Sequence, residues 1–377
     1  MTSRHDKKPV ILVVDDAAEQ MNRGMVLRFG DRARVTVRHP SGIQSEDIEE
    51  AQLVLMDYRL EDWPERDSQC AAFNVRTGMA LATIVRESAD EASADRLTAV
   101  ALHTGHLAEA SGRIRPPYSR HVVARLNNLE WVFEKTDEER FDQIVELAKT
   151  AQHLDGVWPP DSNASEARAQ ELLRMDPEAE WFDRSWREVR ECQPPIHQSA
   201  GHSQGVFFLR WLLHQVLPYP CFLWDINSVA ARLRLHVEDL ERLRASGCDL
   251  ARDLQQFKYT GILEGFLGPR WWRVAIDDYI WELGGGSSGR SGEFEDQLRE
   301  KAGEDLRLVG PHDPVVCLNR DFRPADVASP QDAVRVRPDY WPPFADAAWM
   351  AIDTVRSEEE LAAMVEPLDQ YRIETDG

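Results

Sequence analysis

The feature that most constrains this chain is a regular alternation of strand and helix patterns over its first 150 residues. Five short runs rich in Val, Leu and Ala end at polar residues, which predicts strands buried on both faces. These runs are residues 10–14, 35–37, 53–56, 98–102 and 129–133. Helical patterns fall between or after them, at residues 17–29, 78–87 and 138–149. The alternation predicts an α/β fold, a doubly wound five-stranded parallel sheet with helices on both faces.

Polar side chains stand directly after four of these predicted strands. Asp15 and Asp16 follow the first strand and Asp57 follows the third, while Thr104 and Lys135 follow the fourth and fifth. Parallel strands bring their carboxyl ends to one crevice, so we expect these side chains to meet. Three carboxylates at close range repel one another unless a divalent cation lies among them, and hard oxygen ligands suit Mg²⁺. A lysine and a hydroxyl beside such a metal suit phosphoryl transfer.

These motifs, in this order, resemble the signature of response-regulator receiver domains of two-component signalling. The matching segments are VVDD at 13–16, LVLMD at 53–57, HTG at 103–105 and FEK at 133–135. The resemblance spans residues 9–150, about two fifths of the chain. Each motif is weak by itself, but their order and their position after successive strands are specific. The resemblance implies a flavodoxin-like receiver fold and a histidine kinase or phosphotransfer protein as partner.

The resemblance also assigns roles to individual residues. It implies that Asp57 is the phosphoacceptor and that Mg²⁺ is held by Asp15, Asp16, Asp57 and the backbone carbonyl of Arg59. It further implies that Thr104 is the switch hydroxyl and that Lys135 pairs with the phosphoryl group.

Several positions depart from the family pattern. An insertion at 61–77 follows Asp57, and the stretch 107–128 is long. Thr136 replaces the usual proline after the lysine, and Val132 stands where an aromatic switch residue is usual. Two alternatives therefore stay open: a degenerate receiver that takes no phosphoryl group, and a flavodoxin-like domain with merely solvated acids. Because all five chemical side chains are present, an active site is favoured.

The remainder of the chain carries no recognised family signature. We expect a receiver domain at 1–150 and, because of its Pro, Ser, Asn and Asp content, a linker at 151–165. A mainly helical output domain is expected at 166–283, a flexible Gly/Ser loop at 284–292 and an α+β segment at 293–377. Within these regions the patterns predict a central apolar helix at 205–217, strands at 306–309 and 315–318, and a helix near 344–356.

Two fragments of the C-terminal part suggest chemistry that we weigh less. Residues 201–205 match the G-x-S-x-G elbow of hydrolases, but the preceding residues cannot form the strand that the elbow needs. Ser203 is therefore expected to cap a helix. Residues 227–243 have helix-turn-helix spacing, yet the second helix would open with Glu238 and Asp239. An ordinary helical hairpin is the favoured interpretation there.

Charge and composition exclude some partners. The net charge is −22, and most of it arises from residues 151–377, so nucleic acid and anionic lipid are disfavoured. No apolar run is long enough to span a membrane, and the five cysteines form no CxxC pair, which fits the cytoplasm. We predict an atypical response regulator, with no enzymatic activity beyond its own phosphorylation and dephosphorylation, that acts through protein contacts. A DNA-binding regulator, a phosphate sink and a hydrolase at Ser203 remain as alternatives, and a homodimer is left open.

Overall fold

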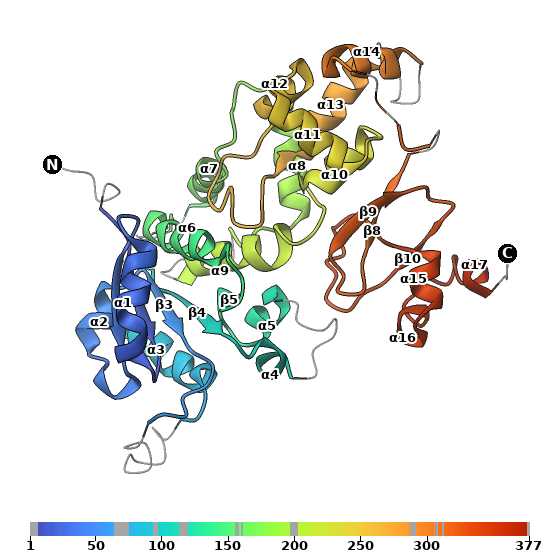
Figure 1. Cartoon of the computed structure of the whole chain (residues 1–377). Coiled ribbons are helices and arrows are strands. Elements are labelled where there is room, and N and C mark those ends of the chain that lie inside the picture. Colours follow the sequence, from blue (N-terminus) through green and yellow to red (C-terminus); the bar gives the residue numbers. More distant parts are fainter. Residues whose placement is uncertain are drawn as a thin grey trace. The chain divides into compact units, whose positions relative to one another are not determined.

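The computed structural model describes residues 7–63, 75–92, 97–112, 120–154, 158–159, 161–196, 203–286, 292–304, 306, 308–310 and 313–374. The chain divides into two compact units (Figure 1). Unit 1 comprises Met1–Glu171, Pro194–Pro218 and Gly265–Leu267. Unit 2 comprises Leu172–Gln193, Tyr219–Glu264 and Gly268–Gly377.

Unit 1 is built on a five-stranded sheet with the order β2-β1-β3-β4-β5. All its neighbouring strands pair in parallel. The strands are β1 (Val10–Val14), β2 (Arg34–Arg38), β3 (Leu53–Met56), β4 (Ala99–Thr104) and β5 (Trp131–Glu134). Strands β3 and β4 are buried throughout, as expected for the centre of a parallel sheet. This order confirms the predicted doubly wound, flavodoxin-like fold.

Helices cover both faces of this sheet. Helices α1 (Ala18–Phe29) and α6 (Arg140–His153) lie on one face, where the rings of Phe29 and Phe141 meet edge to face at 5.4 Å. The opposite face is covered by α2 (Ser45–Glu50), α3 (Gly78–Ala92), α4 (Leu107–Ser111) and α5 (Arg120–Leu126), which share one apolar cluster with the sheet. A short 3-10 turn, η2 (Pro40–Gly42), follows β2.

Unit 1 also contains segments that lie beyond the predicted receiver boundary at residue 150. Helix α7 (Ser162–Leu172) belongs to it up to Glu171, and helix α9 (Ser203–Trp211) continues into a π-helical segment, η4 (Leu212–Val216). Phe266 packs edge to face on Trp131 of β5, with a centroid distance of 5.0 Å. The units thus divide differently from the predicted boundaries, because the apolar helix expected at 205–217 buries its side chains within unit 1.

The helical part of unit 2 surrounds an apolar cluster. Its elements are α8 (Phe182–Glu191), α10 (Ile226–Arg232), α11 (Val237–Ser246), α12 (Asp249–Gln256), α13 (Arg273–Leu283), α14 (Gly292–Ala302) and a two-stranded antiparallel sheet of β6 (Leu223–Trp224) with β7 (Trp271–Trp272). Trp224, Trp271 and Trp272 are buried, whereas Trp281 is exposed. Residues 287–291 of the predicted Gly/Ser loop lie outside the described residues.

The end of unit 2 is the predicted α+β segment. Strands β8 (Val315–Leu318), β9 (Pro324–Ala328), β10 (Ala333–Val336) and β11 (Ala348–Ala351) form a sheet of order β10-β11-β8-β9, followed by α15 (Ile352–Arg356), α16 (Glu359–Ala362) and α17 (Tyr371–Glu374). The predicted strand at 315–318 is confirmed.

Two predictions for this segment were wrong in part. The helix near 344–356 is limited to α15, because residues 348–351 alternate between buried and half-buried positions and pair as β11. At 306–309 the described residues form no strand, and residue 307 lies outside them. None of the described helices is long and apolar enough to cross a membrane.

Candidate functional site

Three carboxylates gather at the carboxyl end of the parallel sheet in unit 1. Asp15 and Asp16 follow β1, and Asp57 follows β3, which is paired with β1. The Asp57 N–H donates to the carbonyl of Val14 at 2.9 Å, which continues the ladder and sets Asp57 beside Asp15. One oxygen from each of the three carboxylates lies within 4.8 Å of the others. Asp15 and Asp57 are buried and Asp16 is half-buried.

Lys135 brings a positive charge to this cluster. Its Nζ lies 3.0 Å from Asp15 Oδ2 and 3.1 Å from Asp57 Oδ2. Its position is fixed by the ladder, since the Lys135 N–H donates to the carbonyl of Thr104 at 2.8 Å. Burial lowers the pKa of Lys135, but the carboxylates of Asp57 and Asp15 outweigh burial and raise that pKa above its ordinary value. The ammonium therefore stays charged between the two acids.

Ionisation of Asp57 is disfavoured in this cluster. Burial raises the pKa of Asp57; Lys135 acts in the opposite direction, while the charge of Asp15 adds to the rise. The net direction is upward, because burial and the Asp15 charge together outweigh the attraction of the Lys135 ammonium.

Each carboxylate is oriented by a backbone N–H on one oxygen. Ala17 donates to Asp15 Oδ1 at 2.9 Å, Tyr58 donates to Asp57 Oδ1 at 2.9 Å, and Asp62 donates to Asp16 Oδ2 at 2.6 Å. Three carboxylates and one ammonium leave two negative charges uncompensated among the described residues. Oriented oxygen ligands with this excess charge fit a hard divalent cation such as Mg²⁺.

Thr104 ends β4 beside Lys135 and is completely buried. Its Oγ1 accepts a hydrogen bond from the His106 N–H at 2.9 Å. A hydroxyl that accepts one bond can still donate its own proton, so Thr104 can serve an anion at the crevice.

Two residues of the site region escaped sequence reasoning. His103 is buried next to Thr104; burial lowers the pKa of His103 to about 3, assisted by the charges of Lys135 and Arg140. Gly78 begins α3 against the backbone of Asp57, where an added Cβ would lie 1.8 Å from the Asp57 carbonyl oxygen. The local sequence predicts neither the buried, neutral state of His103 nor the requirement for glycine at 78, because each depends on residues distant in sequence.

The loop after Asp57 closes one side of the cluster. The guanidinium of Arg59 binds Glu109 of α4, with Nε 3.0 Å from Oε2. The role predicted for the Arg59 carbonyl as a metal ligand stays a prediction. Farther along, the carbonyl of Asp62 lies 3.1 Å from His39 Nε2, and Trp63 packs edge to face on His39. Residues 64–74 of the predicted insertion lie outside the described residues.

The two C-terminal fragments have different outcomes. Helix α9 begins at Ser203, but residues 197–202 and the Ser203 side chain lie outside the described part, so the hydrolase motif is not placed. Helices α10 and α11 form the predicted hairpin. Its arginines are engaged: Arg232 with Asp277, Arg234 with Glu295, and Arg242 with Asp239 and Glu304, while Arg244 lies over the Trp271 ring.

No family model and no curated protein matches this chain. Among solved structures it is similar to a response regulator protein from Burkholderia pseudomallei, described with a phosphorylated aspartic acid, a calcium ion and citrate. The identity is 17%, the TM-score is 0.23, and the match covers 55% of this chain and 99% of that one. With so low a TM-score, the receiver-like fold of unit 1 rests on its own strand order and helix placement.

Proposed function

We propose that this protein is an atypical two-component response regulator that accepts a phosphoryl group on Asp57. The observation that carries the proposal is the position of Lys135 Nζ, 3.0 Å from Asp15 and 3.1 Å from Asp57, at the edge of the acidic cluster. A phosphoryl group on Asp57 would replace one carboxylate charge by about two negative charges and meet this ammonium directly. The order of the sheet supports the same assignment.

The chemistry follows from these positions. A carboxylate oxygen of Asp57 attacks the phosphorus of a phosphohistidine on a histidine kinase or phosphotransfer protein. The P–N bond breaks, its electron pair stays on the imidazole nitrogen, and an acyl phosphate forms on Asp57. Lys135 pairs with the phosphoryl oxygens, and the Thr104 hydroxyl donates to one of them. Mg²⁺, when bound by Asp15, Asp16, Asp57 and the Arg59 carbonyl, neutralises charge on the transferred group.

Output is proposed to occur through protein contacts rather than nucleic acid. The arginines of the hairpin α10–α11 pair with neighbouring carboxylates or lie over Trp271. These contacts compete with the binding of DNA phosphates by the same arginines. The acidic excess of residues 151–377 points the same way. A cytoplasmic location and a homodimer stay predictions. The phosphate sink and the hydrolase at Ser203 have no supporting contact among the described residues.

The test is covalent labelling of the full chain. With Mg²⁺ and acetyl phosphate, wild type should gain one hydroxylamine-labile phosphoryl group, detected as a mass increase of the intact protein. Asp57→Ala should gain none. Asp31→Ala is the matched control, because Asp31 is a fully exposed carboxylate of the same unit, paired only with Lys8 in the described part. Labelling that persists in Asp57→Ala, or an unlabelled wild type, would contradict the proposal.

A further inference from the structure

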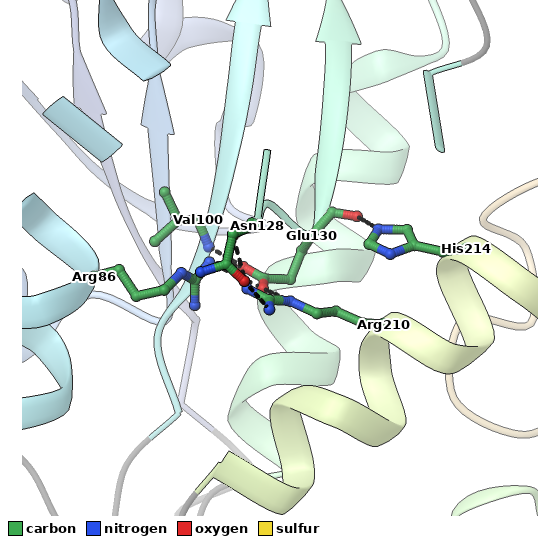
Figure 2. A network of polar contacts seen from close by, with 6 residues as sticks. All are labelled: Arg86, Val100, Asn128, Glu130, Arg210 and His214. Atoms are coloured by element: carbon green, nitrogen blue, oxygen red, sulfur yellow. Dashed lines mark hydrogen bonds and ion pairs between the residues drawn. The ribbon is translucent and has the colours of Figure 1, made fainter. Parts of the chain in front are cut away.

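A buried carboxylate lies at the opposite end of β5 from Lys135. Glu130, the residue before β5, is completely buried. Its oxygens accept from Arg86 Nη2 at 2.7 and 3.0 Å, from Arg210 Nε at 2.8 Å, and from the Val100 N–H (Figure 2). Burial alone would raise the pKa of Glu130, but Arg86 and Arg210 hold it below its ordinary value. The carboxylate therefore stays ionised within the unit.

Helix α9 and its π-helical end hold the turn that leads into β5. Arg210 Nη2 donates to the Asn128 carbonyl at 2.7 Å, and Nη1 donates to the Asn128 side-chain oxygen. Four residues farther on, within the π-helical segment, His214 Nε2 lies 2.9 Å from the carbonyl oxygen of Glu130. Figure 2 shows both side chains reaching the turn from the same helix. One helix thus contacts Asn128 and both the carboxylate and the backbone of Glu130.

Three uncommon features converge at this contact. Asn128 has φ of 58°, a left-handed conformation that is uncommon outside glycine, although asparagine adopts it more readily than most residues. The segment Leu212–Val216 is π-helical, with the Leu217 N–H donating to the Leu212 carbonyl, a geometry that is rare and frequent at functional sites. Glu130 carries a fully buried charge. The π-helical segment and the buried charge, coinciding at one place, favour a functional reason for the contact.

The charges allow the helix to move without leaving a buried charge unpaired. Arg86 alone neutralises Glu130, so Arg210 is a second, additional cation on the same carboxylate. Movement of Arg210 away would leave the Arg86–Glu130 pair intact. Phe208, Leu209 and Leu213 are completely buried and keep the helix attached. We therefore expect a shift of the helix over the turn rather than its release.

Strands β4 and β5 connect this contact to the phosphorylation site. The backbone N–H of Val100, near the start of β4, donates to the carboxylate of Glu130, the residue before β5. The two strands then pair from Ala101↔Trp131 to Thr104↔Glu134, and the next residue is Lys135. Four strand residues span about 13 Å. These two paired strands therefore offer a direct route by which a displacement of Thr104 and Lys135 toward a phosphoryl group would reach the turn that Arg210 holds.

We propose that helix α9 with its π-helical end is the element of this chain that responds to the phosphorylation state of Asp57, with Arg210 as the positioning residue. This inference rests on the proposed function and names an internal partner for the receiver. The coupling free energy is reciprocal. If a phosphoryl group on Asp57 changes the equilibrium position of α9, the position of α9 changes the free energy of the phosphorylated state by the same amount.

The test is amide hydrogen exchange of the full chain with and without Mg²⁺ and beryllofluoride, a phosphoryl mimic. Exchange of the amides at 205–217 should change by about five-fold or more in wild type. Asp57→Ala should abolish the difference, and Arg210→Ala should strongly reduce it. Arg32→Ala, which removes an exposed arginine paired with Asp142 in the same unit, should leave the difference intact.

A second measurement separates positioning from mere stability. The affinity of the full chain for beryllofluoride, measured with Mg²⁺, should change by about five-fold or more in Arg210→Ala. Arg210→Lys keeps the positive charge but loses the planar, multiple donors of the guanidinium. The value measured for this variant should lie between those of Arg210→Ala and wild type. If the protein is still labelled on Asp57 but hydrogen exchange at 205–217 is the same with and without beryllofluoride, this inference alone is overturned. Failure of labelling overturns the proposed function and this inference together.

Discussion

At the scale of residues, the site could be predicted where a rule about strand ends applies. Asp15, Asp57 and Lys135 stand at the ends of apolar runs, so the parallel sheet had to bring them to one edge, and their proximity in the structure agrees. Gly78 and Glu130 could not be predicted. The need for glycine at 78 comes from the Asp57 carbonyl, and the second cation on Glu130 comes from Arg210, 80 residues away.

Gly78 gives the sharpest test of packing around Asp57. A Cβ at this position would overlap the Asp57 carbonyl oxygen, which is backbone and cannot rotate away. We expect Gly78→Ala to lower the free energy of unfolding of unit 1 by about 1–3 kcal/mol and to impair labelling of Asp57.

The matched control is Gly24→Ala, measured by the same urea titration. Gly24 lies exposed in the middle of α1 with no atom within 4 Å of an added Cβ, so alanine there should raise stability by about 0.5–1 kcal/mol. If both glycine-to-alanine changes alter the free energy of unfolding in the same direction, or if Gly78→Ala is fully labelled, the close approach at Asp57 is refuted.

At the scale of elements, the sequence predicts α9 as a helix but not as part of unit 1. Its apolar sequence indicates burial on all sides, yet apolar side chains do not specify which partner surface they meet. The decisive contacts are polar ones, those of Arg210 and His214 with the turn before β5. Similarly, β11 was taken for helix because a four-residue alternating segment is too short to distinguish the two periods.

Docking of this helix should depend on pH through His214. Burial lowers the pKa of His214 to about 4, whereas the unfolded chain takes up this proton near pH 6.5. The neutral ring therefore stabilises the fold fully above pH 6.5, and this stabilisation is lost as the pH falls from 6.5 toward 4. The loss is up to about 1.4 kcal/mol per pH unit for this group.

We expect His214→Gln to flatten the fall in urea unfolding midpoint of the full chain between pH 6.5 and 5. Part of the slope should remain, because burial also lowers the pKa of His103, to about 3. His153→Gln, at an exposed position of α6, should keep the wild-type slope. An unchanged slope in His214→Gln would mean that this imidazole is not buried as a neutral group.

At the scale of the whole molecule, the strand-helix alternation was enough to predict the fold class but not the extent of the units. Residues 1–150 contain every strand of the parallel sheet, and a sequence boundary there is natural. The boundary misses α9 because its contacts with the sheet are separated by some 80 residues of chain. Long-range packing of this kind leaves no periodic signal around the contacting positions.

The extent of unit 1 can be tested with two fragments, residues 1–154 and 1–218. The shorter one ends with α6, and the longer one adds α9 and η4, including the buried Phe208, Leu209 and Leu213. Burial of such a side chain contributes about 1.5–3 kcal/mol. Three of them therefore amount to a large part of the about 5–15 kcal/mol that stabilises a domain. We expect 1–218 to be monomeric, cooperatively folded and labelled on Asp57.

Fragment 1–154 should be poorly folded or aggregated, since it exposes the apolar surface that α9 covers and leaves the Asn128 carbonyl without Arg210. Circular dichroism, size-exclusion chromatography and acetyl phosphate labelling of the two fragments decide the matter side by side. If 1–154 matches 1–218 in unfolding midpoint and in labelling, the receiver is complete without α9. Equal affinities of the two fragments for beryllofluoride, measured with Mg²⁺, would also remove the reason to assign the helix a part in the response to phosphorylation, since reciprocity requires the helix to affect binding at Asp57.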